Sequence, residues 1–363
     1  MKYKICVYAI CKNESAFARR WYNSVKEADG VFVLDTGSTD GSAEILRELG
    51  ATVEEKTVLP WRFDVARNLS LAMVPQDTDI CVCCDLDEVF DTGWRQALEE
   101  QWQPCTTSAS YHYVWSFDED GNEQTVFNMN KIHALKDHTW RHPVHEVLTY
   151  TGCAPTVTHI DGIRLCHYPD NGKSRASYLP LLELAVAEDP RDDRNMHYLG
   201  REYYFKGMWD KGISTLSRHL AMPTALWDDE RGASMRYIAK CYMQKGATEL
   251  ARVWLYRAIA QTPSTREPYI DMASLLLDQK DYDGVVFMCL EALKITDKRE
   301  SYITDAACWG ALPYDLLSLG YYYTHRYAKA LDAVTVAYTL SPNDERIKGN
   351  LSIMTKKLQE HSN

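Results

Sequence analysis

The sequence predicts an α/β domain followed by an all-α helical domain. Up to about residue 90, short apolar strands alternate with helices of about ten residues, which implies a parallel sheet with helical crossovers. From residue 173 onward, the apolar spacing is helical to the end of the chain. A length of 363 residues fits two domains of ~150 residues or more. We therefore predict one domain over residues 1–172 and a second over residues 173–363.

Each element of the first domain has its own sequence pattern. The helix expected over residues 42–49 ends before Gly50, a residue type that commonly terminates helices. Residues 108–117 and 124–133 alternate between apolar and polar positions, as antiparallel strands do. Further strands are predicted at 3–10, 31–34, 51–55, 79–84 and 156–166, and further helices at 15–28 and 64–73.

Small residues recur through the second domain at positions where paired helices approach closely. Gly200 and Ala239 each precede a tyrosine and then a glycine turn, and the expected turns near residues 207, 246, 281 and 326 lie 35 to 45 residues apart. This pattern resembles tetratricopeptide repeats, whose period is about 34 residues. A plain helical bundle is the alternative. Either arrangement offers a surface that can hold a partner.

Composition excludes several classes of protein. With 40 basic and 51 acidic residues, the net charge is −11 and the sequence has no basic block. Nonspecific nucleic-acid binding is therefore disfavoured, although a local basic groove stays open. No apolar run approaches the ~18 residues of a membrane span. The 11 cysteines, several inside apolar runs, indicate buried thiols in a reducing compartment, so we expect a cytoplasmic protein. A homodimer stays open.

Polar side chains follow three of the predicted parallel strands. Ligands of open α/β sheets bind at the carboxyl ends of such strands. Asn13-Glu14 follows the first strand, and Asp35 with a Gly-Ser-Thr-Asp-Gly turn follows the second. This turn also suits a plain capped loop. Asp85-Leu86-Asp87-Glu88 follows the fourth strand, and its crowded carboxylates favour a hard divalent cation such as Mg²⁺ or Mn²⁺.

Taken in order, these motifs resemble the family-2 glycosyltransferases with a GT-A fold. The set comprises Asn13-Glu14, Asp35-x-Gly-Ser-Thr-Asp-Gly, Asp64-x-x-Arg67-Asn68 and Asp85-x-Asp87-Glu88. The segment from Trp140 to Glu146, and Cys166-His167-Tyr168, resemble a branch with tetratricopeptide-like repeats behind the catalytic domain. That branch includes peptide glycosyltransferases of the bacteriocin-modifying type. The resemblance implies a Rossmann-like GT-A domain over residues 1–172 that binds a nucleotide sugar, followed by a tetratricopeptide-like repeat domain.

The resemblance also implies roles for individual residues. Asp35 would contact the nucleobase of a UDP-sugar, and Arg67 the diphosphate or the shape of the site. The expected cofactor is Mn²⁺ or Mg²⁺, bound by Asp87, Asp85 and His167. The nucleotide-sugar contacts implied in addition are Ala9, Asn13, Glu14, Ser38, Asp85 and Leu86.

For the chemistry, the resemblance implies transfer with inversion at the anomeric carbon. Glu146 would be the general base, with His145 as the second choice. Trp115, Trp140 and Arg141 are candidates for contacts to sugar or acceptor, although tryptophan is more commonly a core residue. The acceptor, a peptide, protein, glycan or other biomolecule, would be held by the helical repeats. The alternative function is an inactive transferase-like scaffold that binds a partner through those repeats.

Overall fold

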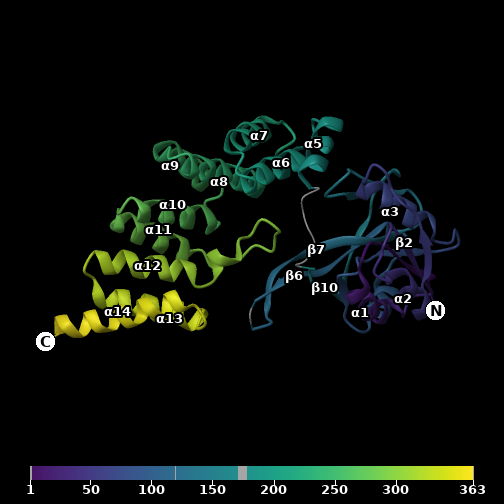
Figure 1. Ribbon diagram of the computed structural model, residues 1–363, viewed down its shortest axis with the longest axis horizontal. Helices are drawn as coiled ribbons and strands as arrows, with labels where there is room; N and C mark the ends of the chain where they lie inside the picture. The colour runs from purple at the N-terminus through teal and green to yellow at the C-terminus, as the bar shows by residue number, and fades with distance from the viewer. Residues whose placement is uncertain (1, 119, 171–177, 363) are drawn as a thin grey trace. The chain divides into compact units, whose positions relative to one another are not determined.

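The computed structural model describes residues 2–118, 120–170 and 178–362, and these divide into two compact units (Figure 1). The first unit ends at Glu188 and the second begins at Asp189. The predicted boundary after residue 172 falls within 171–177, outside the described residues. Helix α5 (Tyr178–Glu188) belongs to the first unit because Glu188 forms an ion pair with Arg62 and the ring of Tyr178 lies against Phe63.

The first unit is built around a mixed sheet of eight strands in the order β3-β2-β1-β4-β7-β6-β10-β5. In the parallel half, β1 (Ile5–Cys11) lies between β2 (Gly30–Asp35) and β4 (Ile80–Cys83), and β3 (Thr52–Glu55) lies beyond β2. Cys11 pairs with Asp35 and Tyr8 with Cys83, so the carboxyl ends of three strands meet at one edge. The predicted alternation of strands and helices is confirmed.

The other half of the sheet is mainly antiparallel. Strand β7 (Glu123–Ala134) pairs antiparallel with β4 and β6 (Ser108–Phe117), and β10 (Val157–His167) runs parallel to β6. The edge strand β5 (Glu88–Phe90) and helix α4 (Trp94–Gln101) were not predicted. A separate two-stranded sheet of β8 (His138–Arg141) and β9 (Val147–Tyr150) was also not predicted.

Helices cover the parallel strands, as their apolar sequences require. Side chains of β1 alternate between two cores: Ile5 and Val7 pack with Trp21 and Trp94, whereas Tyr8 packs with Trp140. The helices beside this half of the sheet are α1 (Ser15–Val25), α2 (Ser42–Leu49) and α3 (Phe63–Ala72). All 11 cysteines are free, and all except Cys105 and Cys153 are buried, which matches the predicted role of thiols as core residues.

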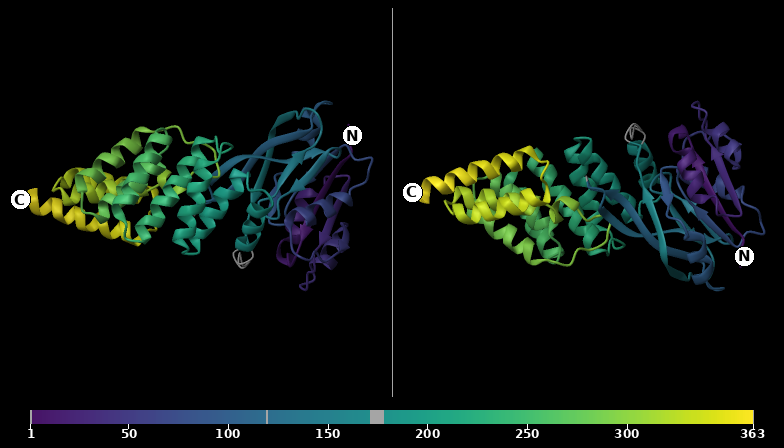
Figure 2. Two further views of the ribbon diagram at one scale, coloured as in Figure 1. Left: turned by 90° about the horizontal axis from the view of Figure 1, so that it is seen from above. Right: turned by 90° about the horizontal axis from the view of Figure 1, so that it is seen from below.

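The second unit is an array of antiparallel helix pairs, visible from two further sides in Figure 2. The pairs are α6 (Asp193–Phe205) with α7 (Trp209–Ala221), α8 (Asp228–Gln244) with α9 (Thr248–Gln261), α10 (Glu267–Asp278) with α11 (Tyr282–Lys294), and α12 (Leu312–Tyr323) with α13 (Tyr327–Leu340). Helix α14 (Glu345–Ser362) packs on α13, and a short 3-10 helix spans Ala306–Trp309. Each pair also contacts the next, so the helices form a repeat array and not a single bundle.

Glycines close the turns and the contacts of this array. Gly207 and Gly246, in the predicted turns, have φ values of +72° and +71°, which L side chains rarely adopt. Gly200 on α6 faces Leu216 on α7, where an added Cβ would lie 2.4 Å from the Leu216 Cγ. The small-residue pattern therefore marks real close approaches between helices. Among the described helices, none combines the length and apolarity needed to cross a bilayer.

Candidate active site

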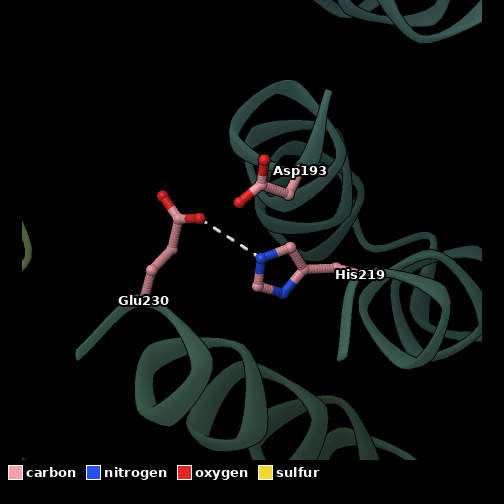
Figure 3. Close-up of side chains that lie close together, drawn as sticks. All are labelled: Asp193, His219 and Glu230. Atoms are coloured by element: carbon pink, nitrogen blue, oxygen red, sulfur yellow. Dashed lines mark hydrogen bonds and ion pairs between the residues drawn. The ribbon is translucent and has the colours of Figure 1, made fainter. Parts of the chain in front are cut away.

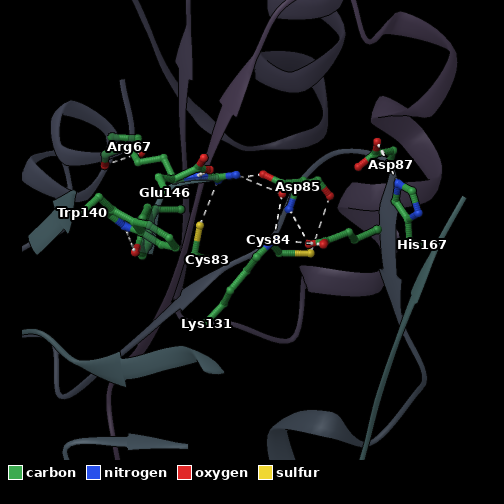
Figure 4. Close-up of polar contacts among 12 residues, drawn as sticks. Arg67, Cys83, Cys84, Asp85, Asp87, Lys131, Trp140, Glu146 and His167 are labelled. Carbon is green, nitrogen blue, oxygen red and sulfur yellow. Dashed lines mark hydrogen bonds and ion pairs between the residues drawn. The ribbon is translucent and has the colours of Figure 1, made fainter. Parts of the chain in front are cut away.

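Arg67 is the centre of a buried ion-pair network at the carboxyl edge of β4 (Figure 4). It projects from α3, and its Nη1 and Nη2 donate to the two oxygens of Asp85 at 2.7 and 3.1 Å. Its Nε donates to Glu146 Oε1 at 2.5 Å. Burial opposes the charge of Arg67, but the carboxylates of Asp85 and Glu146 outweigh it and raise its pKa well above the ordinary value. Arg67 therefore links a predicted donor residue to the predicted base.

Lys131 on β7 supplies a second cation to the same network. Its Nζ donates to Asp85 Oδ2 at 2.8 Å and to Glu88 Oε1 at 3.0 Å, and Tyr113 donates its hydroxyl to Glu88 Oε1 at 2.8 Å. Burial alone would raise the pKa of Asp85, but Arg67 and Lys131 hold it well below its usual range. Burial raises the pKa of Glu88, and Lys131 offsets only part of that rise. Asp85 is therefore the firmly ionised carboxylate of the network.

Asp87 and His167 form a separate pair beside this network. Asp87 Oδ2 lies 3.4 Å from His167 Nε2, and the other ring nitrogen, Nδ1, lies 3.0 Å from the carbonyl oxygen of Trp115. Nδ1 therefore carries the proton donated to that carbonyl, and Nε2 faces the carboxylate. Two acceptors this close need a proton or a cation between them. A carboxylate and an imidazole whose orientation is held from behind are a donor set that suits a divalent metal ion.

Asp85, predicted as a metal ligand, contacts two cationic side chains in the structure. Both oxygens of Asp85 accept hydrogen bonds from Arg67, and one also accepts from Lys131, because these two cations lie on either side of the carboxylate. Figure 4 shows Asp87 and His167 facing each other away from those contacts. The described structure thus offers Asp87 and His167 as the adjacent metal donors at this edge.

Asp35 ends β2 with one oxygen fully engaged and one without a partner. Its Oδ1 accepts from the backbone N–H groups of Gly37 at 2.9 Å and Ser38 at 2.8 Å. Its Oδ2 is buried and has no hydrogen-bond partner among the described residues. A buried acceptor left unpaired costs about 1–3 kcal/mol. A ligand that donates a hydrogen bond to Asp35 would recover that energy.

Asn13 and Ser38 join the loops that follow β1 and β2. Ser38 Oγ accepts from the Asn13 backbone N–H at 2.8 Å, and the Thr39 N–H donates to Asn13 Oδ1 at 2.8 Å. The backbone N–H of Glu14 donates to Ser42 Oγ at 2.8 Å. These hydrogen bonds connect the two loops beside Asp35. Ser38 thus accepts from a backbone N–H group, as the capped-loop interpretation expects.

Several predicted contact residues lie in the core instead. Ala9 and Leu86 are 0% and 2% exposed, because they pack into the main apolar cluster, so their side chains do not reach the edge. Trp140 is also buried and donates its Nε1–H to the Tyr8 hydroxyl at 2.8 Å. It is a platform for the guanidinium of Arg67, 5.0 Å above its ring.

Trp115 differs from Trp140 because its side chain is accessible. It is 42% exposed and stacks on His167 with ring centroids 4.3 Å apart. Of the two predicted sugar-stacking tryptophans, it is the one that a ligand can reach. Arg141, at the end of β8, is exposed as well.

Asn68 explains how the segment carrying Glu146 reaches Arg67. Its side-chain amide donates to the Trp140 carbonyl and accepts from the Trp140 N–H, both at 2.9 Å, which holds β8 on α3. The backbone of His145 has φ +49°, and its ring meets Tyr178 of α5 at 5.9 Å. The chain therefore directs His145 toward α5 and Glu146 toward Arg67.

Sequence reasoning missed Lys131 and did not assign a role to Glu88. Lys131 lies 46 residues from Asp85 and 43 from Glu88, and no motif connects them. The available signal was a lysine within a predicted strand directly before Ile132 and His133, which the structure buries. Such a position predicts a side chain close to the core, although it does not identify the partner.

Comparison with known families agrees with this geometry. The profile described as "Glycosyl transferase family 2" matches residues 6–153. This range includes the residues of the candidate site described above, with the exception of His167. The N-terminal unit is a family 2 glycosyltransferase domain. The glycosyltransferase domain thus contains Asp35, Arg67, Asp87 and Glu146 within the matched range. The bacteriocin-modifying branch, by contrast, is not identified by this match.

The chain is also similar to solved structures, among them a TPR repeat-containing protein. The APC/C heterotetramer Cut9-Hcn1 is 17% identical over 50% of this chain and 33% of its own, with a TM-score of 0.41. Yeast Tom70 is 15% identical over 53% and 37%, with a TM-score of 0.40. The C-terminal part of a TPR repeat-containing protein from Cytophaga hutchinsonii is 16% identical over 49% and 64%, with a TM-score of 0.40.

The chain therefore spans about a third of the length of the first two of these structures. No curated protein sequence matches it.

Proposed function

We propose that the protein is a metal-dependent, inverting glycosyltransferase that moves a sugar from a UDP-sugar to a nucleophile on a peptide, protein or glycan. The observation that carries the proposal is the Asp87–His167 pair, 3.4 Å apart, in a family 2 glycosyltransferase domain. Asp87 follows β4, and Asp35 ends β2, the strand on the other side of β1.

Asp35 supports uridine as the nucleoside. Its buried Oδ2 needs a hydrogen-bond donor, and the ring N–H of uracil is such a donor. Cytosine has no ring N–H, and only its exocyclic amino group could donate to this oxygen. Guanine has a ring N–H of its own, and for this reason the experiment below compares UDP with GDP. Asp85, held by Arg67 and Lys131, would accept from the ribose.

Asp87 and His167 would hold Mn²⁺ or Mg²⁺. When bound, the ion supplies positive charge that stabilises the diphosphate leaving group. Glu146 takes the proton of the acceptor nucleophile as that atom bonds to the anomeric carbon. The bond from the anomeric carbon to the diphosphate oxygen breaks in the same displacement, which inverts the configuration. Arg67 orients the Glu146 carboxylate during this step.

The helical unit would hold the acceptor. It contains a cavity of about 410 Å³, including the space at its open mouth, between α8, α10 and the segment that leads to α12. Its walls combine hydroxyl groups of serine and threonine with the indole of Trp309, two guanidinium groups and three carboxylates (Arg236, Arg299, Asp229, Glu267 and Asp297). Hydroxyl, guanidinium and indole groups suit a polar acceptor such as a peptide or glycan.

Donor hydrolysis by the full-length protein tests the proposal. UDP-sugars, with Mn²⁺ present, should release UDP and free sugar slowly, and chelation should abolish the release. UDP should raise the melting temperature more than GDP does. Asp87→Asn should lose metal-dependent binding of UDP, whereas the control Asp91→Asn, an exposed carboxylate paired with Arg164, should retain it. A protein that neither binds nor hydrolyses any donor would be the inactive scaffold.

A further inference from the structure

Three helices of the second unit bring metal-binding side chains together. Asp193 begins α6, His219 lies in the last turn of α7, and Glu230 lies in the first turn of α8. One ligand atom from each lies within 4.8 Å of the other two. His219 and Glu230 are 0% and 4% exposed, whereas Asp193 is partly exposed. Figure 3 shows the carboxylate of Asp193 beside the contact between the other two side chains.

A second set of residues holds the outer atoms of this cluster. The Nδ1 of His219 lies 2.9 Å from Ser234 Oγ, which in turn lies 2.7 Å from the Nδ1 of His197. Tyr302 donates its hydroxyl to Glu230 Oε2 at 2.8 Å. The atoms that remain, His219 Nε2 and Glu230 Oε1, face each other at 3.2 Å. Metal ligands in proteins are oriented in this way, through hydrogen bonds to the atoms that do not touch the ion.

The two carboxylates of the cluster have no lysine or arginine partner among the described residues. Both of them, Asp193 and Glu230, converge on one imidazole. Like charges brought together in a buried place repel each other unless a cation lies between them. Ligand atoms about 2.0–2.1 Å from a tetrahedral zinc ion lie roughly 3.3 Å apart. The separation of 3.2 Å between His219 and Glu230 is close to that value.

We propose that Asp193, His219 and Glu230 bind one divalent transition-metal ion, with Zn²⁺ as the best match. The site would have one nitrogen and two oxygen ligands from the protein, and a fourth position on the side of Asp193 filled by water. Because its ligands come from α6, α7 and α8, the ion would tie together the first three helices of the second unit. This site is separate from Asp87 and His167, which lie in the glycosyltransferase domain, and it does not depend on the proposed reaction.

Zinc binding by the full-length protein tests the site. The Asp87–His167 pair could also bind zinc, so it is first disabled by substitution of His167. We would use His167→Gln as the background, strip it of metal, add Zn²⁺ and measure bound zinc after gel filtration. We expect about one equivalent of zinc and a rise in melting temperature. Co²⁺ in its place should give the strong visible absorption of a four-coordinate site.

Asp193→Ala is the decisive variant because it leaves the buried His219–Glu230 contact and the Asp192 cap of α6 intact. In the same background it should weaken zinc binding ~100-fold or more. Removal of a residue that only hydrogen-bonds to a metal ligand already lowers metal affinity by about 10–100-fold. Asp210→Ala removes an exposed carboxylate from the first turn of α7 and should bind zinc as the background does. Equal zinc content with and without Asp193, or no zinc in the background protein, would overturn the site and leave only a His219–Glu230 ion pair.

Discussion

Arg67 donates hydrogen bonds to Glu146 and to Asp85 at the same time, so one buried guanidinium joins the proposed base to a proposed donor contact. Its Nε serves Glu146, whereas its two terminal nitrogens serve Asp85. The ring of Trp140 lies beneath the guanidinium and is itself buried. Displacement of either carboxylate would therefore move Arg67 and, with it, the other carboxylate.

Arg67→Lys tests this coupling. A lysine keeps the charge but cannot form the planar fork that serves both carboxylates. Breaking a buried ion pair costs about 3–5 kcal/mol, so the melting temperature of the first unit should fall. Sugar transfer should fall on the order of 100-fold, because the reacting groups lose their mutual placement. The control is Arg47→Lys, an exposed arginine that pairs with Glu55, and it should change neither quantity.

Glu146→Gln tests the assignment of the general base. The amide keeps the shape of the side chain and removes its basicity, so transfer should fall by about 10²–10⁴. Binding of UDP with Mn²⁺, measured by calorimetry, should stay the same, since Glu146 is not one of the proposed donor or metal contacts. The matched control is Glu123→Gln, a carboxylate that accepts from Arg164 and has no contact with Arg67 among the described residues.

The pH dependence of transfer at saturating donor decides whether Glu146 acts as the base. For an alcohol acceptor, the loss in Glu146→Gln should persist across the pH range. For a thiol acceptor, it should fade as pH rises, because the thiolate needs no base. Rates for Glu146→Gln that match the wild type at every pH would remove Glu146 from the mechanism and direct attention to His145.

Gly200→Ala should destabilise the second unit. An added Cβ would lie 2.4 Å from the Cγ of the buried Leu216, so α6 and α7 would have to separate or repack. Overpacking of this kind costs about 1–3 kcal/mol, even though alanine favours the helix. Gly349→Ala on α14 is the control, because no atom lies within 4 Å of its added Cβ. It should be neutral or stabilise by up to about 1 kcal/mol in urea unfolding.

His133 should make the first unit less stable in acid. Trp140 donates to the Tyr8 hydroxyl, which lies 2.8 Å from His133 Nε2. Burial, with a smaller contribution from His138, lowers the pKa of His133 to about 3. An unfolded histidine has a pKa of about 6.5, so below that pH the unfolded state binds a proton that the folded state does not. With respect to His133, the free energy of unfolding is therefore at its full value above pH 6.5 and decreases as the pH falls toward 3.

Urea unfolding at several pH values measures this effect against His133→Gln. From pH 6.5 to 4.5, the wild type should lose about 2–3 kcal/mol relative to the variant, at roughly 1.4 kcal/mol per pH unit. Parallel pH profiles for the two proteins would show that His133 does not carry the acid sensitivity.

The sequence by itself determined the alternation of strands and helices from β1 to β4 and the sheet edge at which the candidate site residues lie. Apolar strands alternating with amphipathic helices allow few arrangements other than a parallel sheet, and parallel strands place their carboxyl ends together. Asp35 and Asp87 could therefore be assigned to one edge from their positions after β2 and β4. In the second unit, Gly200, Gly207 and Gly246 marked a close contact and two turns because glycine adopts positive φ readily and has no Cβ. Lys280 and His325 adopt the same positive φ in two other turns, which residue type alone did not indicate.

Only the tertiary structure decided which side chains meet. Lys131 approaches Asp85 from a strand 46 residues away, and Arg67 reaches Glu146 across 79 residues. Likewise, the fold buries Trp140 and exposes Trp115, and it turns Asp85 toward cations while Asp87 faces His167. Residue type predicts chemistry and local spacing predicts an element. The direction of a side chain, however, depends on what packs around it, and here that is contributed by segments far apart in the chain.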